Sequence, residues 1–412
     1  MLSFNTLPQE SKNILESIPA IINKTFPIPG RFRSRLPSQV AELSRLLTGG
    51  RNDRAVSYLN RPNLLAAYLH YFLPWNIYRL CLILPNLNLT LSAGDTIVDL
   101  GCGPLTFTAA LWISRPDLRK LPLKFYCIDQ CAPVLEAGKK FFAALTGSSP
   151  GSHQLWKIHS VRKTIDIRAR AGRNRSGKPA NNNFRGALVC TINMFNELYE
   201  YLPHSDSKGL ERIAENAVSI MNGYALPSAS ILTVEPGIPH SGHFISLLRA
   251  AFIKSGSSPL SPCPHLEACP LPGGLAGKNR AKKRWCHFSF TVNKDLHLPK
   301  DLHRLSAAAG LPKERLVLSY LLTGSGAANA PQRKTPKNSM RVISDAFPLP
   351  DNRYGRYGCS AQGLILLTGE KRQIENTVSG SLVNYNTELK PLFDEKSGSL
   401  IARLAADKEQ TK

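Results

Sequence analysis

The sequence predicts an α/β protein built around a Rossmann-like, doubly wound sheet. Residues 96–100 form a short apolar run, which is typical of a buried parallel strand. Gly101 and Gly103 follow directly and allow a tight turn, and the apolar stretch 105–113 predicts the next helix. A second run, 124–129, again has the pattern of a strand that precedes a helix. This alternation of strands and helices predicts a largely parallel sheet.

Further elements of the same domain follow along the chain. The second run ends on Asp129, where an acid can accept hydrogen bonds from ribose hydroxyls. Pro133 opens the next helix, and Gly147 is placed to end it. Apolar runs at about 186–199 and 230–237 predict two later strands.

The flanking regions predict a chain of several parts. With 412 residues, the protein is long enough for two or three domains. We expect an N-terminal helical region at 1–90, where apolar residues recur at helical spacing, and the Rossmann-like domain at 91–255. A basic, metal-binding C-terminal module is expected at 256–370. A polar tail, 371–412, follows it, with a short helix near Leu400.

The glycine turn after the first strand distinguishes between cofactors. A dinucleotide fingerprint, G-x-G-x-x-G, requires a glycine at the position of Thr106. The D-x-G-x-G string is instead similar to the first motif of S-adenosylmethionine-dependent methyltransferases, although Leu105 replaces the usual third glycine of that motif. The alternative is a Rossmann-like scaffold that has lost its ligand. The candidate cofactor-binding residues are Asp99, Gly101, Gly103 and Asp129.

Four cysteines in the C-terminal half indicate a metal site. Their spacing, C-x5-C-x16-C-x72-C, is not the paired C-x2-C of a zinc ribbon. Two of them are each followed by proline, as in ferredoxin-type ligation, so a [4Fe-4S] cluster is favoured over zinc. Buried or scattered free cysteines are the alternative. The candidate ligands are Cys263, Cys269, Cys286 and Cys359.

The charge of the chain favours a polyanionic partner. The formal net charge is +23 and the pI is near 9.8. Residues 276–341 hold fourteen lysines and arginines against three acids, and residues 161–178 hold seven against one. Because the charge is gathered in patches, we expect binding to a polyanion that weakens steeply with salt.

Nothing in the sequence predicts a membrane protein or an exported one. No run of eighteen uninterrupted apolar residues occurs. The first residues lack the pattern of a secretory signal and the Arg-rich pattern of a mitochondrial transit peptide. Nine cysteines, an odd number, do not suggest a disulfide framework. The expected location is a bacterial-type cytoplasm.

No catalytic residue can be assigned from these patterns. The Asn/Asp-Pro-Pro-aromatic motif of amino-directed nucleic-acid methyltransferases is missing after the fourth strand. Cys190 lacks the Pro-Cys context of a carbon-5 cytosine methyltransferase and is expected in the core. Asn196 and Glu197 either face the pocket or cap the next helix. His240 and His243 are expected to be neither metal ligands nor bases.

Together these motifs make the chain resemble a known family. CPHLEACPL, WCHF, NMFNELY and VEPG are similar to the methyltransferase-like family associated with the small ribosomal subunit, which includes the mitochondrial methyltransferase-like protein seventeen and bacterial relatives. The resemblance implies a methyltransferase fold, a four-cysteine iron–sulfur cluster and binding to small-subunit ribosomal RNA in assembly or translation. It assigns the four cysteines as cluster ligands, and Asp99, Gly101 and Gly103 to the cofactor loop.

Two functions of different class remain open. In the first, the protein is an S-adenosylmethionine-dependent methyltransferase that acts on or at small-subunit ribosomal RNA. In the second, it is a non-catalytic assembly factor that uses the fold and a cluster, or zinc, only to bind RNA. The glycine turn with Asp129 favours the first, whereas Leu105 and the missing catalytic motif favour the second.

Overall fold

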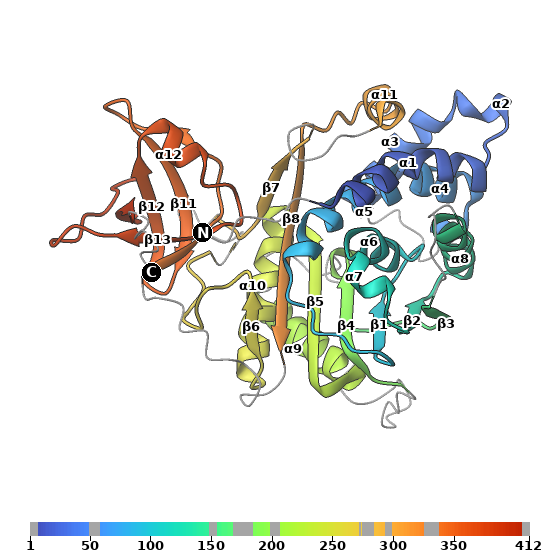
Figure 1. The fold of residues 1–412 in the computed structure, drawn as a ribbon, viewed down its shortest axis with the longest axis horizontal. Coiled ribbons are helices and arrows are strands. Elements are labelled where there is room, and N and C mark those ends of the chain that lie inside the picture. Colours follow the sequence, from blue (N-terminus) through green and yellow to red (C-terminus); the bar gives the residue numbers. More distant parts are fainter. Residues whose placement is uncertain are drawn as a thin grey trace.

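The computed structural model shows a large α/β domain beside a smaller β-domain (Figure 1). The residues that it describes are 7–48, 58–147, 155–167, 184–197, 207–271, 273, 284–292, 299–324 and 338–405. Much of the predicted basic stretch 161–178 and parts of 276–341 lie outside these residues. Within the described residues, no helix combines the length and apolarity that a membrane crossing requires.

The large sheet has eight strands. Side by side they are β3 (Lys157–Arg162), β2 (Lys124–Asp129), β1 (Thr96–Leu100), β4 (Gly186–Ile192), β5 (Ala225–Pro236), β8 (Arg315–Gly324) and β6 (Ser258–Ser261), with β7 (Phe288–Thr291) also paired to β8. Strands β1 to β5 are parallel, whereas β8 is antiparallel to β5, β6 and β7. The predicted Rossmann-like sheet is confirmed, with an added antiparallel edge.

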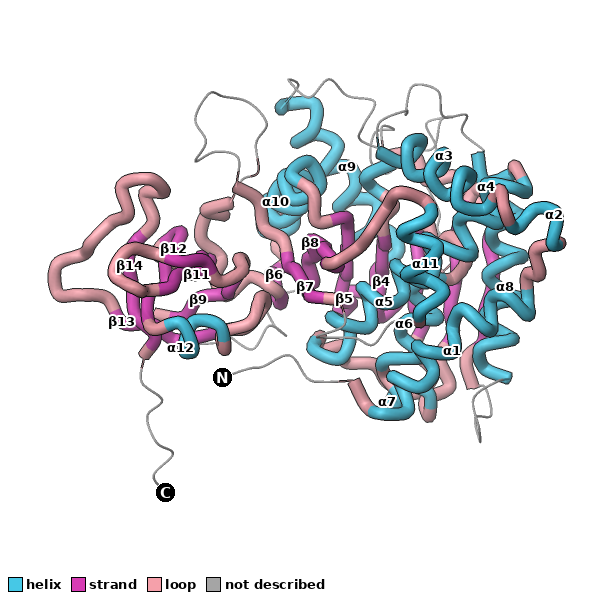
Figure 2. The backbone as a smooth tube through the Cα atoms, turned by 90° about the horizontal axis from the view of Figure 1, so that it is seen from above, coloured by secondary structure: helices cyan, strands magenta, loops and turns pink. Residues whose placement is uncertain are grey.

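Alternate side chains of the central strand enter different cores. Ile97 on β1 belongs to the core beneath α6 (Thr106–Ser114) and α8 (Ala132–Gly147). Val98 and Leu100 belong to a second core, which also contains residues of α9 (Ser207–Tyr224) and α10 (Pro239–Lys254). Because successive side chains of a strand point to opposite faces, the sheet is buried on both sides. Figure 2 shows the sheet between these helices.

The predicted N-terminal helical region is confirmed. Its helices are α1 (Gln9–Thr25), α2 (Gly30–Arg33), α3 (Leu36–Thr48), α4 (Pro62–Ala67), the π-helix η3 (Tyr68–Phe72) and α5 (Leu73–Ile83), with the short 3-10 turns η2 (Tyr58–Asn60) and η4 (Leu84–Asn86). The aromatic residues of α5 are largely in the core, where Trp75 and Tyr78 are almost fully buried. Two short helices elsewhere are α7 (Pro116–Arg119) and α11 (Lys300–Ala308).

The smaller β-domain is a closed ring of strands. They are β9 (Ser339–Val342), β10 (Phe347–Pro348), β11 (Tyr354–Ser360), β12 (Gly363–Gly369), β13 (Leu382–Asn386) and β14 (Leu400–Leu404). The pairs run β11–β12–β14–β13–β9 and back to β11, and only β12–β14 is parallel. With α12 (Lys371–Glu375) between β12 and β13, this is the topology of the five-stranded OB-fold barrel.

This barrel corrects the prediction for the end of the chain. The short helix expected near Leu400 is wrong, because Leu400–Leu404 is strand β14. Residues 371–404, expected in a polar tail, supply α12, β13 and β14. Leu400 and Ala402 alternate with more exposed neighbours and point into the barrel core with Val383. A five-residue apolar stretch does not show by itself whether it pairs with a distant strand.

Candidate cysteine pocket and cofactor loop

The turn between β1 and α6 adopts three left-handed backbone conformations. Gly101 and Gly103 have φ values of +67° and +53°, which glycine adopts without steric cost. Leu105, at the N-terminus of α6, has φ 57°, a conformation that is uncommon for a leucine. Its side chain occupies the space left open by Gly138 of α8. The glycine expected at position 105 is therefore replaced by a leucine that anchors the turn to α8.

Asp129, at the end of β2, faces this turn directly. Its Oδ2 accepts a hydrogen bond from the backbone N–H of Gly103 at 3.0 Å, and its Oδ1 accepts one from Cys131 at 2.9 Å. Burial raises the pKa of this carboxyl, and the backbone donors act in the opposite direction. Asp129 therefore lies directly against the turn and is joined to it by a hydrogen bond.

Asp99, the other predicted acid, lies inside the sheet. It has no exposed surface, and in the described part of the chain neither carboxylate oxygen meets an N–H or O–H donor, which leaves the Cys190 thiol as its polar neighbour. Cys127 and Cys190 are its neighbours in register on β2 and β4. Burial raises the pKa of Asp99 to about 7. Cys190 is fully buried, as the sequence predicted.

Side chains from two other regions cover the turn. Atoms of Met194, just after β4, lie 2.6 Å from where a Cβ of Gly101 would stand, so that glycine makes room for the methionine. Gly103 is more open, with the Tyr68 hydroxyl 3.9 Å from its Cβ position. The Cys131 Sγ lies 3.2 Å from Oδ1 of Asn60. The N-terminal helical region therefore reaches the carboxyl edge of the sheet, where doubly wound folds bind ligands.

An acid that sequence reasoning missed fixes the loop after β4. Glu235, near the end of β5, is fully buried and accepts hydrogen bonds from the backbone N–H groups of Phe195 and Asn196 at 2.9 and 3.0 Å. Asn196 keeps a buried side-chain oxygen without a partner among the described residues. The side chain of Glu197 lies outside the described part, so its predicted role stays a prediction. The VEPG string, which contains Glu235, was the available signal.

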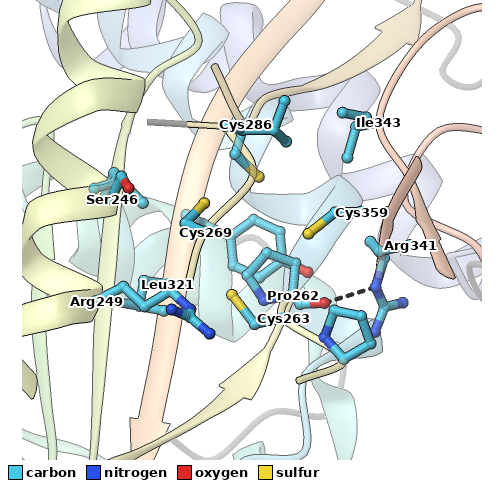
Figure 3. A pocket seen from close by; sticks show the side chains of 14 residues that line it. Ser246, Arg249, Pro262, Cys263, Cys269, Cys286, Leu321, Arg341, Ile343 and Cys359 are labelled. Atoms are coloured by element: carbon cyan, nitrogen blue, oxygen red, sulfur yellow. Dashed lines mark hydrogen bonds between the residues drawn. The ribbon is translucent and has the colours of Figure 1, made fainter. Parts of the chain in front are cut away.

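The predicted metal ligands meet in one pocket between the two domains (Figure 3). Cys263 and Cys269 lie on the segment after β6, and Cys286 lies just before β7. Cys359 comes from β11 of the barrel. All four sulfurs point toward the space between the labelled side chains. Among the described residues, however, no group of three or more His, Cys, Asp or Glu has the arrangement of a metal-ion site.

The backbone around Cys286 is firmly held. The Ser319 hydroxyl on β8 donates a hydrogen bond to the Cys286 carbonyl at 2.7 Å. The neighbouring Trp285 donates its indole N–H to the carbonyl of Gly237 at 3.0 Å. A side chain at position 242 on α10 would collide with the Trp285 ring, which explains the glycine there. The Cys286 thiol is thus positioned by residues of the sheet domain.

Two arginines line the pocket beside the sulfurs. Arg249 on α10 is only 4% exposed and donates from Nη2 to the carbonyls of His265 and Glu267, both at 2.8 Å. Arg341 on β9 donates from Nε to the Pro262 carbonyl at 2.8 Å and from Nη1 to Gly380, also at 2.8 Å. The two arginines therefore hold both sides of the segment that carries Cys263 and Cys269. Neither arginine was identified from the sequence.

The pocket strongly affects the ionisation of its side chains. Burial raises the pKa of the Cys263, Cys286 and Cys359 thiols, and the nearby arginines act in the opposite direction. His265 lies with Nε2 3.2 Å from the Cys359 Sγ. Burial and Arg249 lower the pKa of His265 to about 4, so its ring is neutral at physiological pH. Without a cation the three thiols would remain protonated.

Comparison with known proteins establishes the family. The model of the family described as "Mitochondrial small ribosomal subunit Rsm22" matches residues 95–347. The chain belongs to this family. The match begins at β1 and ends in the barrel at β10, so it spans the glycine turn and three of the four pocket cysteines. No curated protein matches the chain.

Solved structures similar to the chain are methyltransferases. One is a methyltransferase from Pyrococcus furiosus, with 8% identity over 57% of this chain and 78% of that one, at a TM-score of 0.30. Another is the plantazolicin methyltransferase BpumL in complex with SAH, with 11% identity over 77% of this chain and 99% of that one, at a TM-score of 0.28. Similarities of this size carry no argument about function. The strand order itself defines the fold of the chain.

Proposed function

We propose that this member of the Rsm22 family is a methyltransferase-like protein that acts on or at small-subunit ribosomal RNA. It would do so in ribosome assembly or translation, with a [4Fe-4S] cluster held by Cys263, Cys269, Cys286 and Cys359. The observation that carries the proposal is the meeting of these four cysteines, from two domains, in one pocket of a chain whose family is described by the small ribosomal subunit.

The donor set of the pocket fits an iron–sulfur cluster. Four cysteine sulfurs are the usual ligands of [4Fe-4S], and a bound metal keeps its thiolates deprotonated. A cluster is also wider than a single ion, so its ligands stand farther apart than those of one zinc. Zinc remains the less favoured occupant, because Cys263 and Cys269 are each followed by proline, as in ferredoxin-type ligation. The cluster would supply a rigid link between Cys359 on the barrel and the three cysteines beside the sheet.

The turn at the carboxyl edge of β1 partly fits S-adenosylmethionine. The cofactor would supply a reactive methyl group. The open side of Gly103 leaves room for a ligand, and the Asp129 carboxylate has acceptor capacity beyond its backbone donors for a ribose hydroxyl. Met194 already fills the space beside Gly101, however, and no base or nucleophile is assigned. Methyl transfer is thus the less supported part of the proposal.

This crowding favours a second candidate function. A non-catalytic assembly factor needs the shape of the domain but not an open cofactor pocket. Met194 against Gly101, together with Leu105 in the usual glycine position, is the observation that favours it. Both functions share the same cluster and the same RNA partner.

Exposed basic residues on the N-terminal helices support the RNA partner. Arg31, Arg33 and Arg35 are exposed around Phe32, which is itself 39% exposed. Arg31 lies over the Phe32 ring at 4.8 Å. Guanidinium groups contact phosphates, and an exposed aromatic ring can stack on an unpaired base. This surface adds to the two basic stretches predicted from the sequence.

One experiment tests the function and separates the candidates. The protein is mixed with purified small ribosomal subunits and with their RNA, and co-sedimentation and transfer of a labelled methyl group are measured. Co-sedimentation with methyl transfer supports the enzyme, and co-sedimentation without transfer or cofactor binding supports the assembly factor. Absence of any binding to subunits or to their RNA contradicts both.

A further inference from the structure

The four-cysteine pocket contains a buried cation that lacks an anionic partner among the described residues. Arg249 is 4% exposed, its Nε–H meets no oxygen acceptor within the same part of the chain, and its side chain lies against the Cys263 thiol. The ion pairs that the described side chains form involve other lysines and arginines. A buried guanidinium that no carboxylate neutralises is costly. The pocket is therefore electrostatically incomplete as protein alone.

A second arginine approaches the same sulfurs from the barrel. Arg341 on β9 pairs in register with Cys359 on β11 and lines the pocket opposite Arg249. Figure 3 shows the two guanidinium groups on either side of the cysteine sulfurs. The hydrogen bonds of both arginines described above go to neutral backbone carbonyls. Neither set of bonds neutralises the positive charge.

We propose that Arg249 donates its Nε–H to a sulfur of the bound cluster, and that Arg249 and Arg341 together balance the net negative charge of the cluster and its thiolates. This inference rests on the [4Fe-4S] cluster of the proposed function. Donors that surround a cluster set its reduction potential and its retention. The two arginines are thus positioning and tuning residues rather than ligands.

The arrangement has two consequences. A hydrogen-bond donor and a positive charge stabilise the reduced cluster, which is the more negative form, and so raise its reduction potential. The same arginines clamp the segment that carries two ligands, because Arg249 holds the carbonyls of His265 and Glu267 while Arg341 holds that of Pro262. Loss of either arginine should both shift the potential and loosen the cluster.

The test uses the full chain purified without oxygen, with Arg249→Met, Arg249→Lys and Arg341→Met as variants. Lys254→Met is the matched control, because Lys254 lies on the same helix, is 77% exposed and pairs with Glu215 instead. Iron per chain, the midpoint potential in a redox titration followed by electron paramagnetic resonance, and the rate of iron loss to a chelator are measured. Circular dichroism checks that each variant is folded.

The expected result is a more negative midpoint potential and roughly ten- to hundredfold faster iron loss in Arg249→Met, with a smaller change in Arg249→Lys and none in Lys254→Met. Arg341→Met provides the same readout if Arg249→Met does not fold. A wild type that holds iron, with unchanged potential and iron loss in the folded arginine variants, overturns this inference but leaves the cluster intact. A wild type without iron overturns the cluster and the inference together.

Discussion

The cofactor loop and the cysteine pocket differ in how far the protein satisfies its own polar groups. At the loop, Asp129 accepts two backbone N–H groups, and Met194 fills the space that Gly101 leaves. At the pocket, the buried Arg249 guanidinium meets backbone carbonyls and the Cys263 thiol but no carboxylate in the described part of the chain, and burial raises the pKa of three thiols. The acid that faces the loop is thus paired within the chain, although Asp99 behind it is not, whereas the buried cation of the pocket meets no carboxylate among the described residues.

This difference favours a bound ligand in the cysteine pocket over one at the cofactor loop. The hydrogen bonds of Asp129 and the packing of Met194 against Gly101 hold the turn in shape without S-adenosylmethionine, which is compatible with a protein that has lost or reduced catalysis. A pocket with four sulfurs and a buried arginine that meets no carboxylate would be stabilised by a charged group bound in it. A bound cluster is therefore the better supported part of the proposed function, and methyl transfer is the less supported part.

The largest effect is expected from removing the cysteine of the barrel. Cys359→Ser should abolish most of the bound iron, because Cys359 is the proposed ligand from the second domain. Seventy-two residues separate it from Cys286, and releasing a link across such a loop should cost about 4 kcal/mol of unfolding free energy. Iron analysis and urea unfolding measure both effects. Cys131→Ser, which lies outside the pocket, is the control.

A smaller effect is expected at the loop. Asp129→Ala should weaken S-adenosylmethionine binding by about 1.5–3 kcal/mol, the range of a hydrogen bond to a charged group. The same change removes the acceptor for the Gly103 N–H, so unfolding must be measured beside calorimetric binding. Asp129→Asn keeps an acceptor and serves as the milder variant. Equal affinity in the wild type and in folded Asp129→Ala would remove Asp129 from the site.

The basic surface of the N-terminal helices should contribute to the salt dependence of RNA binding. Replacing Arg31, Arg33 and Arg35 with Ala should make the negative slope of log affinity against log salt shallower. The change should be roughly 0.9 for each phosphate that is no longer neutralised. Lys139 and Lys140 on α8, both exposed, provide matched control substitutions. Filter binding to small-subunit RNA at several salt concentrations measures the slope. Unchanged slopes in the triple variant would move the RNA surface elsewhere.

The last effect concerns the pH dependence of the unfolding free energy. The pKa of Asp99 is raised to about 7 in the folded chain, so the folded state binds its proton more tightly than the unfolded state. The contribution of Asp99 to the unfolding free energy is fully present below the pKa of the unfolded chain. It falls by up to about 1.4 kcal/mol per pH unit as the pH rises toward 7. Asp99→Asn should flatten this part of the unfolding curve. A wild-type curve that is already flat there would contradict the burial of an ionisable Asp99.

The sequence predicted the parts that local patterns encode. Residues 96–100 and 124–129 are strands as predicted, because an apolar run followed by glycines or by an acid has few other interpretations. The four cysteines were found from residue type and spacing alone. Their roles as metal ligands stay a prediction.

The missed parts depend on distant neighbours. The barrel closes through pairs such as β9–β13 and β12–β14, which no local period reveals. Arg249 and Arg341 look like ordinary basic residues until the fold brings them beside the sulfurs. Met194 shows its effect on the cofactor loop only through its packing against Gly101.

The barrel turns part of its usual ligand-binding face toward the sheet domain. OB-folds commonly bind oligonucleotides on the face of their second and third strands. Here Cys359 on the second strand and Arg341 on its neighbour line the cysteine pocket instead. Part of a surface that other barrels use for ligands is therefore turned toward the sheet domain. The cluster would fasten the barrel to that domain.

The proposed [4Fe-4S] cluster is tested most directly by the metal content of the wild-type chain purified without oxygen. Iron, acid-labile sulfide and zinc are measured per chain, together with the visible absorption spectrum. The account predicts about four irons and four sulfides per chain and a brown protein whose colour is lost in Cys359→Ser. A colourless protein with a single zinc, or with no metal, would contradict it.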